Sequence, residues 1–138
     1  MSIKEIIDLL FAARERIDFY WNFYVVVVVA VVGWIVTRKE RLTRWTRILV
    51  SVAYVIASAA NLVGLYGSYS FAEALRHDLL RLTAGSPLTS TRAVLVEHSY
   101  ASQRFWAFVV HLVVGAALLL AVWLAHRGSN RAEASAPD

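Results

Sequence analysis

The chain has 138 residues and a formal net charge of +4, with 59% hydrophobic and 17% charged residues and no cysteine. A soluble domain would carry about 25% charged residues, so this composition favours an integral membrane protein over a soluble enzyme. The absence of cysteine excludes disulfides, thiolate metal sites, iron–sulfur clusters and cysteine nucleophiles.

The first predicted element is an amphipathic helix over residues 3–18 that continues into a membrane span over residues 19–37. Ser2 and Glu5 have the spacing of a capping box, in which each side chain binds the backbone N–H of the other residue. Residues 19–37 are a run of 19 uncharged residues, the length that a helix needs to cross about 30 Å of hydrocarbon. Although the run is rich in valine, we expect a helix, because in lipid the backbone must satisfy its own hydrogen bonds.

The connector from Arg38 to Arg47 contains five basic residues and one acidic residue, so the positive-inside rule predicts that it lies in the cytoplasm. The N-terminus is then outside and the C-terminus inside. Counted over the whole chain, seven basic residues lie on each side, so only the density of the connector sets this orientation. Twelve of the 14 basic residues are arginine, a bias typical of GC-rich bacteria, and we therefore expect a bacterial cytoplasmic membrane.

The second span, residues 48–68, is predicted to be the central packing helix. One of its faces carries small residues at spacings of three and four, which would let a neighbouring helix approach closely. These residues are Ala53, Ala57, Ala60, Gly64 and Gly67. A neighbouring face carries the polar residues Ser51, Tyr54, Ser58 and Asn61. The small-residue face is expected to pack against a helix of the same chain, against a partner subunit or against a second copy.

Residues 71–104 are predicted to form a helical hairpin outside the membrane. Ser70 and Glu73 repeat the capping-box spacing and would start the first helix of this hairpin. That helix should stop near residues 82–84, because Gly85 follows with a second breaker, proline, close behind it.

The second helix of the hairpin is expected to begin near Thr91 and to run without a break into the third span, residues 105–126. Together with the helix over residues 3–18, the hairpin would form a small extramembrane bundle. The alternative is that residues 3–18 lie flat in the membrane interface. The expected bundle core is Ile6, Leu10, Leu75, Leu79, Leu82 and Val94.

His111 is the one histidine well inside a predicted span. It lies six residues after Phe105, and Asn61 lies five residues before Tyr66, so the two are at similar depth and are expected to face each other. A hydrogen bond between the helices is the simpler interpretation. A proton or ion path through Asn61, His111 and Tyr54 is the alternative, because imidazole titrates near physiological pH.

Glu73, His77 and His98 are weak candidates for a metal site. Glu73 and His77 are four residues apart on one helix face, and His98 would return on the antiparallel partner. Salt bridges from these groups to neighbouring arginines are the ordinary alternative. The 13-residue spacing of His98 and His111 resembles that of membrane cytochromes of the b type, but the second span offers no facing histidine. We therefore expect no resident metal or cofactor.

The sequence contains no glycine-rich phosphate loop, no G-x-S-x-G or H-E-x-x-H motif and no carboxylate within a span, so we expect a protein that is not an enzyme. It also lacks an extended basic stretch interleaved with aromatic residues, which argues against nucleic-acid binding. The expected fold is an all-α integral membrane protein with three transmembrane helices, in one membrane domain over residues 1–127. Residues 128–138 are expected to be a disordered tail.

The expected role is that of a small membrane subunit that assembles with a larger membrane complex or with itself through the second span and the extramembrane helices. Three spans with an outside N-terminus also resemble, in topology alone, one class of phage holins. That resemblance implies a homo-oligomeric pore as the alternative. A redox subunit that binds a metal or haem is the weaker alternative.

Overall fold

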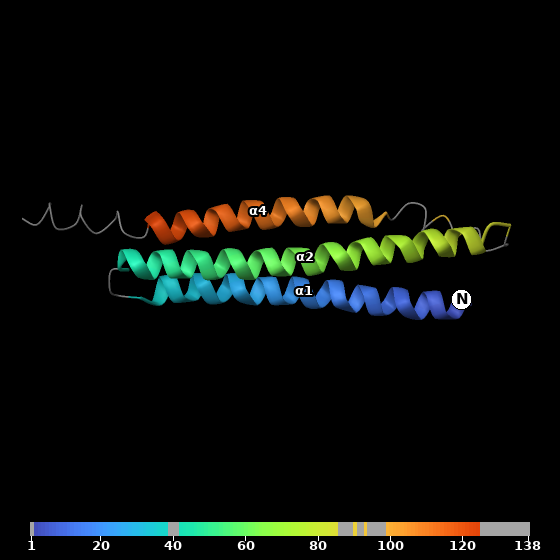
Figure 1. Cartoon of the computed structure of the whole chain (residues 1–138), viewed down its shortest axis with the longest axis horizontal. Coiled ribbons are helices and arrows are strands. Elements are labelled where there is room, and N and C mark those ends of the chain that lie inside the picture. Colours follow the sequence, from blue (N-terminus) through green and yellow to red (C-terminus); the bar gives the residue numbers. More distant parts are fainter. Residues whose placement is uncertain (1, 39–41, 86–89, 91–92, 94–98, 125–138) are drawn as a thin grey trace, which may run out of the picture.

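The computed structural model describes residues 2–38, 42–85, 90, 93 and 99–124. Within these residues the secondary structure is helical, and it comprises three long helices: α1 (Ile3–Thr37), α2 (Arg44–Leu82) and α4 (Tyr100–Leu124). Successive helices run in opposite directions, and α2 lies between the other two and contacts both (Figure 1). The second span is therefore the central packing helix, as predicted.

All three helices are long and apolar enough to cross a membrane, so the chain is an all-helical, multi-pass membrane protein of the lipid bilayer. The 35 residues of α1 and the 39 of α2 extend over roughly 50 to 60 Å, about twice the thickness of the hydrocarbon core. The 25-residue α4 is shorter, and α1 and α2 continue together past its first residue (Figure 1). Part of the α1–α2 pair must therefore lie outside the hydrocarbon.

The first residue of α1 and the last residue of α2 lie where local signals in the sequence predicted them. The Ser2 hydroxyl accepts from the Glu5 N–H at 3.2 Å, and the Glu5 carboxylate accepts from the Ser2 N–H at 2.8 Å, so the first capping box is confirmed. α2 ends at Leu82, which confirms the predicted stop. Gly85 has a φ of 92°, a left-handed conformation that favours glycine because a Cβ would be strained there.

The second predicted capping box, at Ser70 and Glu73, is wrong. α2 continues through both residues, so this part of the chain has no free helix end to cap. The Ser70 hydroxyl instead accepts from Arg104 Nη1 at 3.3 Å, and the Glu73 carboxylate accepts from the Tyr100 N–H at 3.0 Å. Both side chains therefore join α2 to α4.

The predicted unbroken helix from Thr91 into the third span is also wrong. Ser99 is not helical, and α4 begins at Tyr100. The Ser99 hydroxyl accepts from the Ala101 N–H at 3.2 Å, and the Glu73 carboxylate adds a negative charge at the same helix end. These contacts cap the N-terminus of α4. Three further predictions fall outside the described residues: those for Val94, for His98 and for the tail over 128–138.

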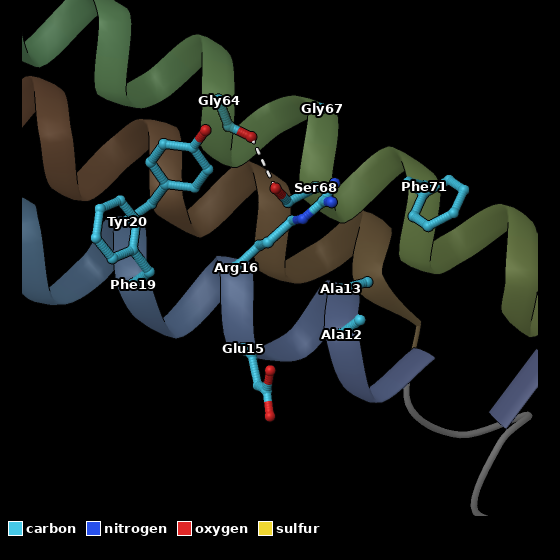
Figure 2. Close-up of a pocket in the computed structure, with 10 residues that line it drawn as sticks. All are labelled: Ala12, Ala13, Glu15, Arg16, Phe19, Tyr20, Gly64, Gly67, Ser68 and Phe71. Carbon is cyan, nitrogen blue, oxygen red and sulfur yellow. Dashed lines mark hydrogen bonds between the residues drawn. The ribbon is translucent and has the colours of Figure 1, made fainter. Parts of the chain in front are cut away.

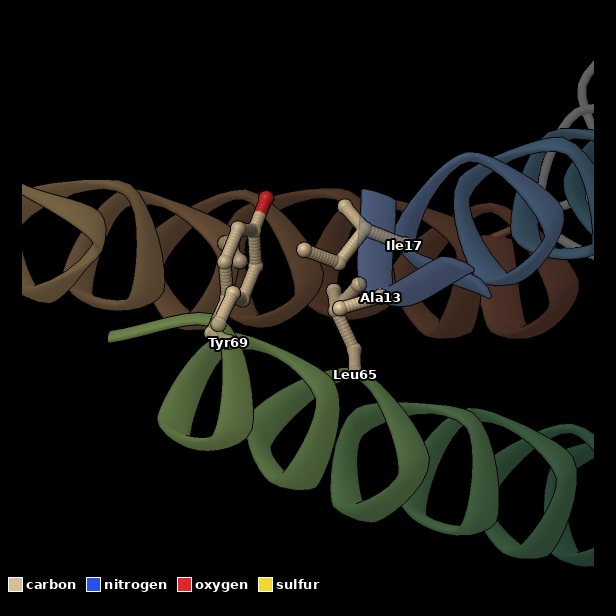
Figure 3. Close-up of a cluster of buried hydrophobic side chains, with 6 residues drawn as sticks. Ala13, Ile17, Leu65 and Tyr69 are labelled. Carbon is tan, nitrogen blue, oxygen red and sulfur yellow. The ribbon is translucent and has the colours of Figure 1, made fainter. Parts of the chain in front are cut away.

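Two buried clusters hold the helices together. The first, where all three helices meet, comprises Ala13, Ile17, Leu65, Tyr69, Ala72 and Ala107; Figure 3 shows Ala13 and Ile17 of α1 directed toward Leu65 and Tyr69 of α2. The second joins α1 to α2 nearer the N-terminus and comprises Ile6, Leu75 and Leu79, with Leu10 packed against them. Leu82 was predicted to belong to this second cluster and is instead 53% exposed. The buried face at this end of α2 passes through Leu75, Leu79 and Thr83 at spacings of four, and Leu82 lies off that face.

Candidate functional site

A group of polar and aromatic side chains is buried between the helices at the depth of the spans. Asn61 of α2 and His111 of α4 are both buried, and Asn61 Nδ2 lies 3.1 Å from His111 Nε2. The structure thus brings together the two residues whose depths match in the sequence.

The contacts of His111 define its tautomer. His111 Nδ1 lies 2.8 Å from the carbonyl oxygen of Ala107, which can only accept, so Nδ1 carries a proton. In the neutral ring Nε2 then accepts from the amide group of Asn61, and both ring nitrogens are engaged. Asn61 Oδ1 is buried and has no hydrogen-bond partner among the residues that the structure describes.

Two tyrosines form a second polar pair beside this one. The hydroxyl oxygens of Tyr24 in α1 and Tyr54 in α2 are 3.2 Å apart, and the Tyr24 ring stacks on His111 with centroids 3.8 Å apart. Within the described residues no hydrogen bond joins the tyrosine pair to Asn61. Ser58 is partly buried and lines a groove together with Tyr54 and His111.

Buried Tyr24 and partly buried Trp21 also belong to this group, although tryptophan and tyrosine are common at the membrane interface. Trp21 Nε1 donates to the Tyr69 hydroxyl at 3.0 Å, and the Trp21 ring centroid lies 5.4 Å from that of His111. One pattern in the sequence could have indicated that these two residues lie in the buried group. Ile17, Trp21 and Tyr24 follow one another at spacings of four and three, which places them on one face of α1.

Replacing either Asn61 or His111 by leucine should destabilise the helix packing, because each change leaves a polar group of the other residue without a partner in an apolar interior. The double variant should be less destabilised than the sum of the two single variants. The coupling free energy should be about 0.6 to 1.7 kcal/mol, as for other hydrogen bonds between membrane helices. Unfolding of the four proteins in detergent mixtures measures this coupling, and strictly additive effects would contradict it.

The predicted small-residue face of α2 divides into a covered and an uncovered part. Gly64 lies beneath Tyr20 of α1, so close that a Cβ at Gly64 would overlap the tyrosine ring. Ala57 is partly buried. The other three members of the face are exposed: Ala53, Ala60 and Gly67. Packing within the chain therefore explains the glycine at position 64, whereas it does not explain the three exposed small residues.

Glu73 joins α2 to the N-terminal end of α4. Its carboxylate accepts from Arg76 Nη2 at 2.6 Å, from Arg76 Nε at 3.0 Å and from the Tyr100 N–H at 3.0 Å. The hydrogen bonds from Arg76, assisted by the Tyr100 N–H and by the charges of Arg76 and His77, lower the pKa of Glu73 to about 2, although burial opposes this shift. Glu73 is therefore ionised at neutral pH and holds the two helices together.

The metal candidates lie in this same network. His77 Nε2 is 3.2 Å from Glu73 Oε1, so these two residues meet as the sequence suggests. Arg76 already occupies the carboxylate, and the part of the chain that the structure describes contains no group of three or more metal-binding side chains. His98 is not among the described residues. The observed arrangement is an ion pair, and it offers no complete ligand set for a metal.

The predicted site residues thus form a buried polar group that joins the helices and an uncovered face on the central helix. Most hydrogen-bonding groups of the buried polar group have partners within the chain. The face on the central helix is exposed and can contact another molecule. Comparisons of the chain with models of protein families, with curated proteins and with solved structures found no match.

Proposed function

We propose that the chain is a small, non-catalytic membrane subunit that assembles with a larger membrane complex or with copies of itself, through α2 and the helix extensions outside the membrane. The observation that carries this proposal is the exposed face of α2, defined as Ala53, Ile56, Ala60, Val63 and Gly67. Neither α1 nor α4 covers it, since Ile56 is 64% exposed and Val63 is 74% exposed. Lipid or another helix must therefore cover this face.

The spacing on the exposed face suits close packing against another helix. Ala53, Ala60 and Gly67 are seven residues apart, and Ile56 and Val63 each follow three residues after an alanine. A seven-residue repeat keeps one stripe toward a partner helix that crosses at about 20°. Because lipid is as apolar as the side chains, close van der Waals contact between small residues is what favours association in a membrane. These features support a docking surface for a second spanning helix.

The helix extensions are the other part of the proposal. Beyond α4, the α1–α2 pair is closed by Ile6, Leu75 and Leu79, which are buried against one another. This contact supports a small helical bundle outside the membrane, in preference to an N-terminal helix that lies flat in the interface, because α1 is continuous from Ile3 to Thr37.

The proposed orientation has this bundle outside a bacterial cytoplasmic membrane. It rests on the connector from Arg38 to Arg47, whose five basic residues favour the cytoplasm. Because the chain has no cysteine, single cysteines at Ser2 and at Thr43 can be labelled in intact cells with a maleimide that does not cross membranes. We expect labelling of the cysteine at position 2 and none of the cysteine at position 43. The converse pattern would indicate the opposite orientation.

A homo-oligomeric pore has less support. A lumen between copies requires polar side chains on an outer face, whereas Tyr54, Asn61 and His111 are buried within one chain and the exposed face of α2 is apolar. A haem-binding subunit also has less support, because both nitrogens of His111 already have partners.

The experiment that tests the proposal compares the wild type with the double variant A53L/A60L after purification from native membranes in a mild detergent. Leucine at both positions should leave the fold of the single chain intact, because both alanines are exposed, and should prevent the close approach of another helix. We expect the wild type to copurify at fixed stoichiometry with a membrane partner or with further copies. The double variant should lose about tenfold or more in association, the equivalent of about 1.4 kcal/mol.

Ala117→Leu is the matched control, since Ala117 is also an exposed small residue within a span but lies on α4. All three proteins should unfold at the same temperature in detergent. Association of A53L/A60L at the level of the wild type, or equal weakening by Ala117→Leu, would show that the exposed face of α2 is not the docking surface. A ring of identical copies that conducts ions in liposomes would favour the pore.

A further inference from the structure

A groove of about 570 Å³ runs between α1 and α2, within the range of volumes typical of ligand sites (Figure 2). Residues that line it include Arg16, Phe19, Tyr20, Gly67, Ser68 and Phe71. It lies where α1 passes from its charged first half into the uncharged run that begins at residue 19. The groove therefore crosses from the headgroup level of the membrane into the hydrocarbon.

The groove changes in chemistry along its length. Arg16 lies near its middle, between an outer end lined by Ala12, Ala13 and Phe71 and an inner end lined by Tyr20 and Gly64. From Arg16 inward, Phe19 and Tyr20 follow one turn later as the first residues of the span. On the α2 side, Gly67 leaves the groove open, because it has no side chain and, apart from its chain neighbours and the nearby backbone of α2, no atom lies within 4 Å of where a Cβ would be. A cation near the middle of the groove and an aromatic, open surface on its membrane side match a molecule with a charged head and an apolar tail.

Arg16 is the cation that faces this groove. Figure 2 shows its side chain extending from α1 toward α2 and Ser68, whereas the carboxylate of Glu15 points away from α2. Arg16 makes no hydrogen bond or ion pair with any residue that the structure describes. The N–H groups of its guanidinium therefore remain free to bind a ligand.

Arg104 provides a comparison on the other side of α2. It directly precedes the third span, whereas Arg16 lies three residues before the first, and it lines a second groove, between α2 and α4. Its Nη1 donates to the Ser70 hydroxyl at 3.3 Å, and its guanidinium lies 4.6 Å from the centroid of the Tyr66 ring. The fold thus supplies partners for Arg104, whereas Arg16 has none within the described chain.

We propose that the groove between α1 and α2 binds one anionic phospholipid, with its phosphate against Arg16 and an acyl chain along Tyr20 and Gly67. A guanidinium binds phosphate through two parallel N–H···O bonds, and basic pockets between spanning helices hold anionic headgroups. The charge selects the headgroup. The apolar half of the groove requires the rest of the lipid, and this distinguishes the ligand from a free phosphate ion.

The test uses single copies of the full chain in nanodiscs of phosphatidylcholine and phosphatidylglycerol. Electron spin resonance with a spin-labelled form of each lipid measures the fraction that the protein immobilises. The wild type should prefer phosphatidylglycerol about fivefold, the effect expected of one arginine near the membrane surface. Arg16→Gln should reduce this preference to near unity. Arg14→Gln is the matched control, because Arg14 is exposed on the same helix and does not line the groove, and it should keep the preference.

Gly67→Leu tests the apolar half of the groove separately from Arg16. The leucine would fill the open part of the groove on the α2 side, so it should lower the immobilised fraction of both lipids. The inference is overturned by an unchanged preference in Arg16→Gln, by an equal loss in Arg14→Gln, or by displacement of the labelled phosphatidylglycerol with inorganic phosphate. Because each nanodisc holds one copy, these results do not depend on the proposed assembly.

Discussion

Replacing Glu73 by glutamine should destabilise the junction of α2 and α4 by about 3 kcal/mol at neutral pH, the low end of the range for breaking a buried ion pair. The Glu73 side chain is 21% exposed and that of Arg76 is 8% exposed, so solvent screens this pair only weakly. The carboxylate also accepts from the Tyr100 N–H and from the Ser99 hydroxyl. Glutamine keeps the shape of the side chain but removes the charge on which the contacts with Arg76 and with the helix end depend.

The pH dependence tests the origin of this effect. Arg76 and the other partners lower the pKa of Glu73 from 4.5 to about 2 in the folded chain. A carboxyl group whose folded-state pKa lies below its unfolded-state pKa stabilises the fold fully above the unfolded-state value. That stabilisation is lost as the pH falls from about 4.5 toward 2. The difference in unfolding free energy between the wild type and Glu73→Gln should therefore be largest near neutral pH and should shrink over this acid range.

Unfolding in detergent at a series of pH values measures this difference, and the other carboxyl groups cancel because both proteins carry them. Asp78→Asn is the control, since Asp78 is exposed on the same helix. Amide hydrogen exchange at Tyr100 should also become faster in Glu73→Gln and stay unchanged in Asp78→Asn. A difference between the wild type and Glu73→Gln that is constant from neutral pH down to pH 2 would contradict the assigned role of the ionised carboxylate.

The features that depend on the solvent were predictable from the sequence. Uncharged runs of sufficient length must be helical in lipid, whatever their intrinsic propensity, and the valine-rich part of α1 is indeed helical. The thickness of the hydrocarbon also fixes depth along each span. For that reason the pairing of Asn61 with His111 follows from counting residues inward from Tyr66 and Phe105.

The features that depend on helix rotation and on distant contacts were not predictable. Periodicity shows that Ala53, Gly64 and Gly67 share a side of α2, but it does not show that Tyr20 of α1 covers only one of them. Glu73 was interpreted as half of a local cap because its spacing from Ser70 matches that motif. The structure uses Glu73 to cap α4 instead, a contact between residues 27 positions apart. A short motif carries no information about such a partner.

Leucine at Ala72 should be among the most damaging single substitutions in the chain. Ala72 is 0% exposed and belongs to the same buried cluster as Ala13 of α1 and Ala107 of α4. Three alanines, one from each helix, let the three backbones approach closely at this level. A larger side chain here must push α1 or α4 away, and overpacking of this kind costs about 1 to 3 kcal/mol.

Ala74→Leu is the matched control for Ala72→Leu, because Ala74 lies two residues further along α2 and is exposed. Both variants add the same atoms to the same helix and have the same helix propensity, so the difference between them isolates packing. Unfolding in detergent should show a loss of about 1 to 3 kcal/mol for Ala72→Leu and less than about 0.5 kcal/mol for Ala74→Leu. If the two variants are equally stable, the three helices do not meet at these alanines, and the arrangement of α1 and α4 around α2 is different.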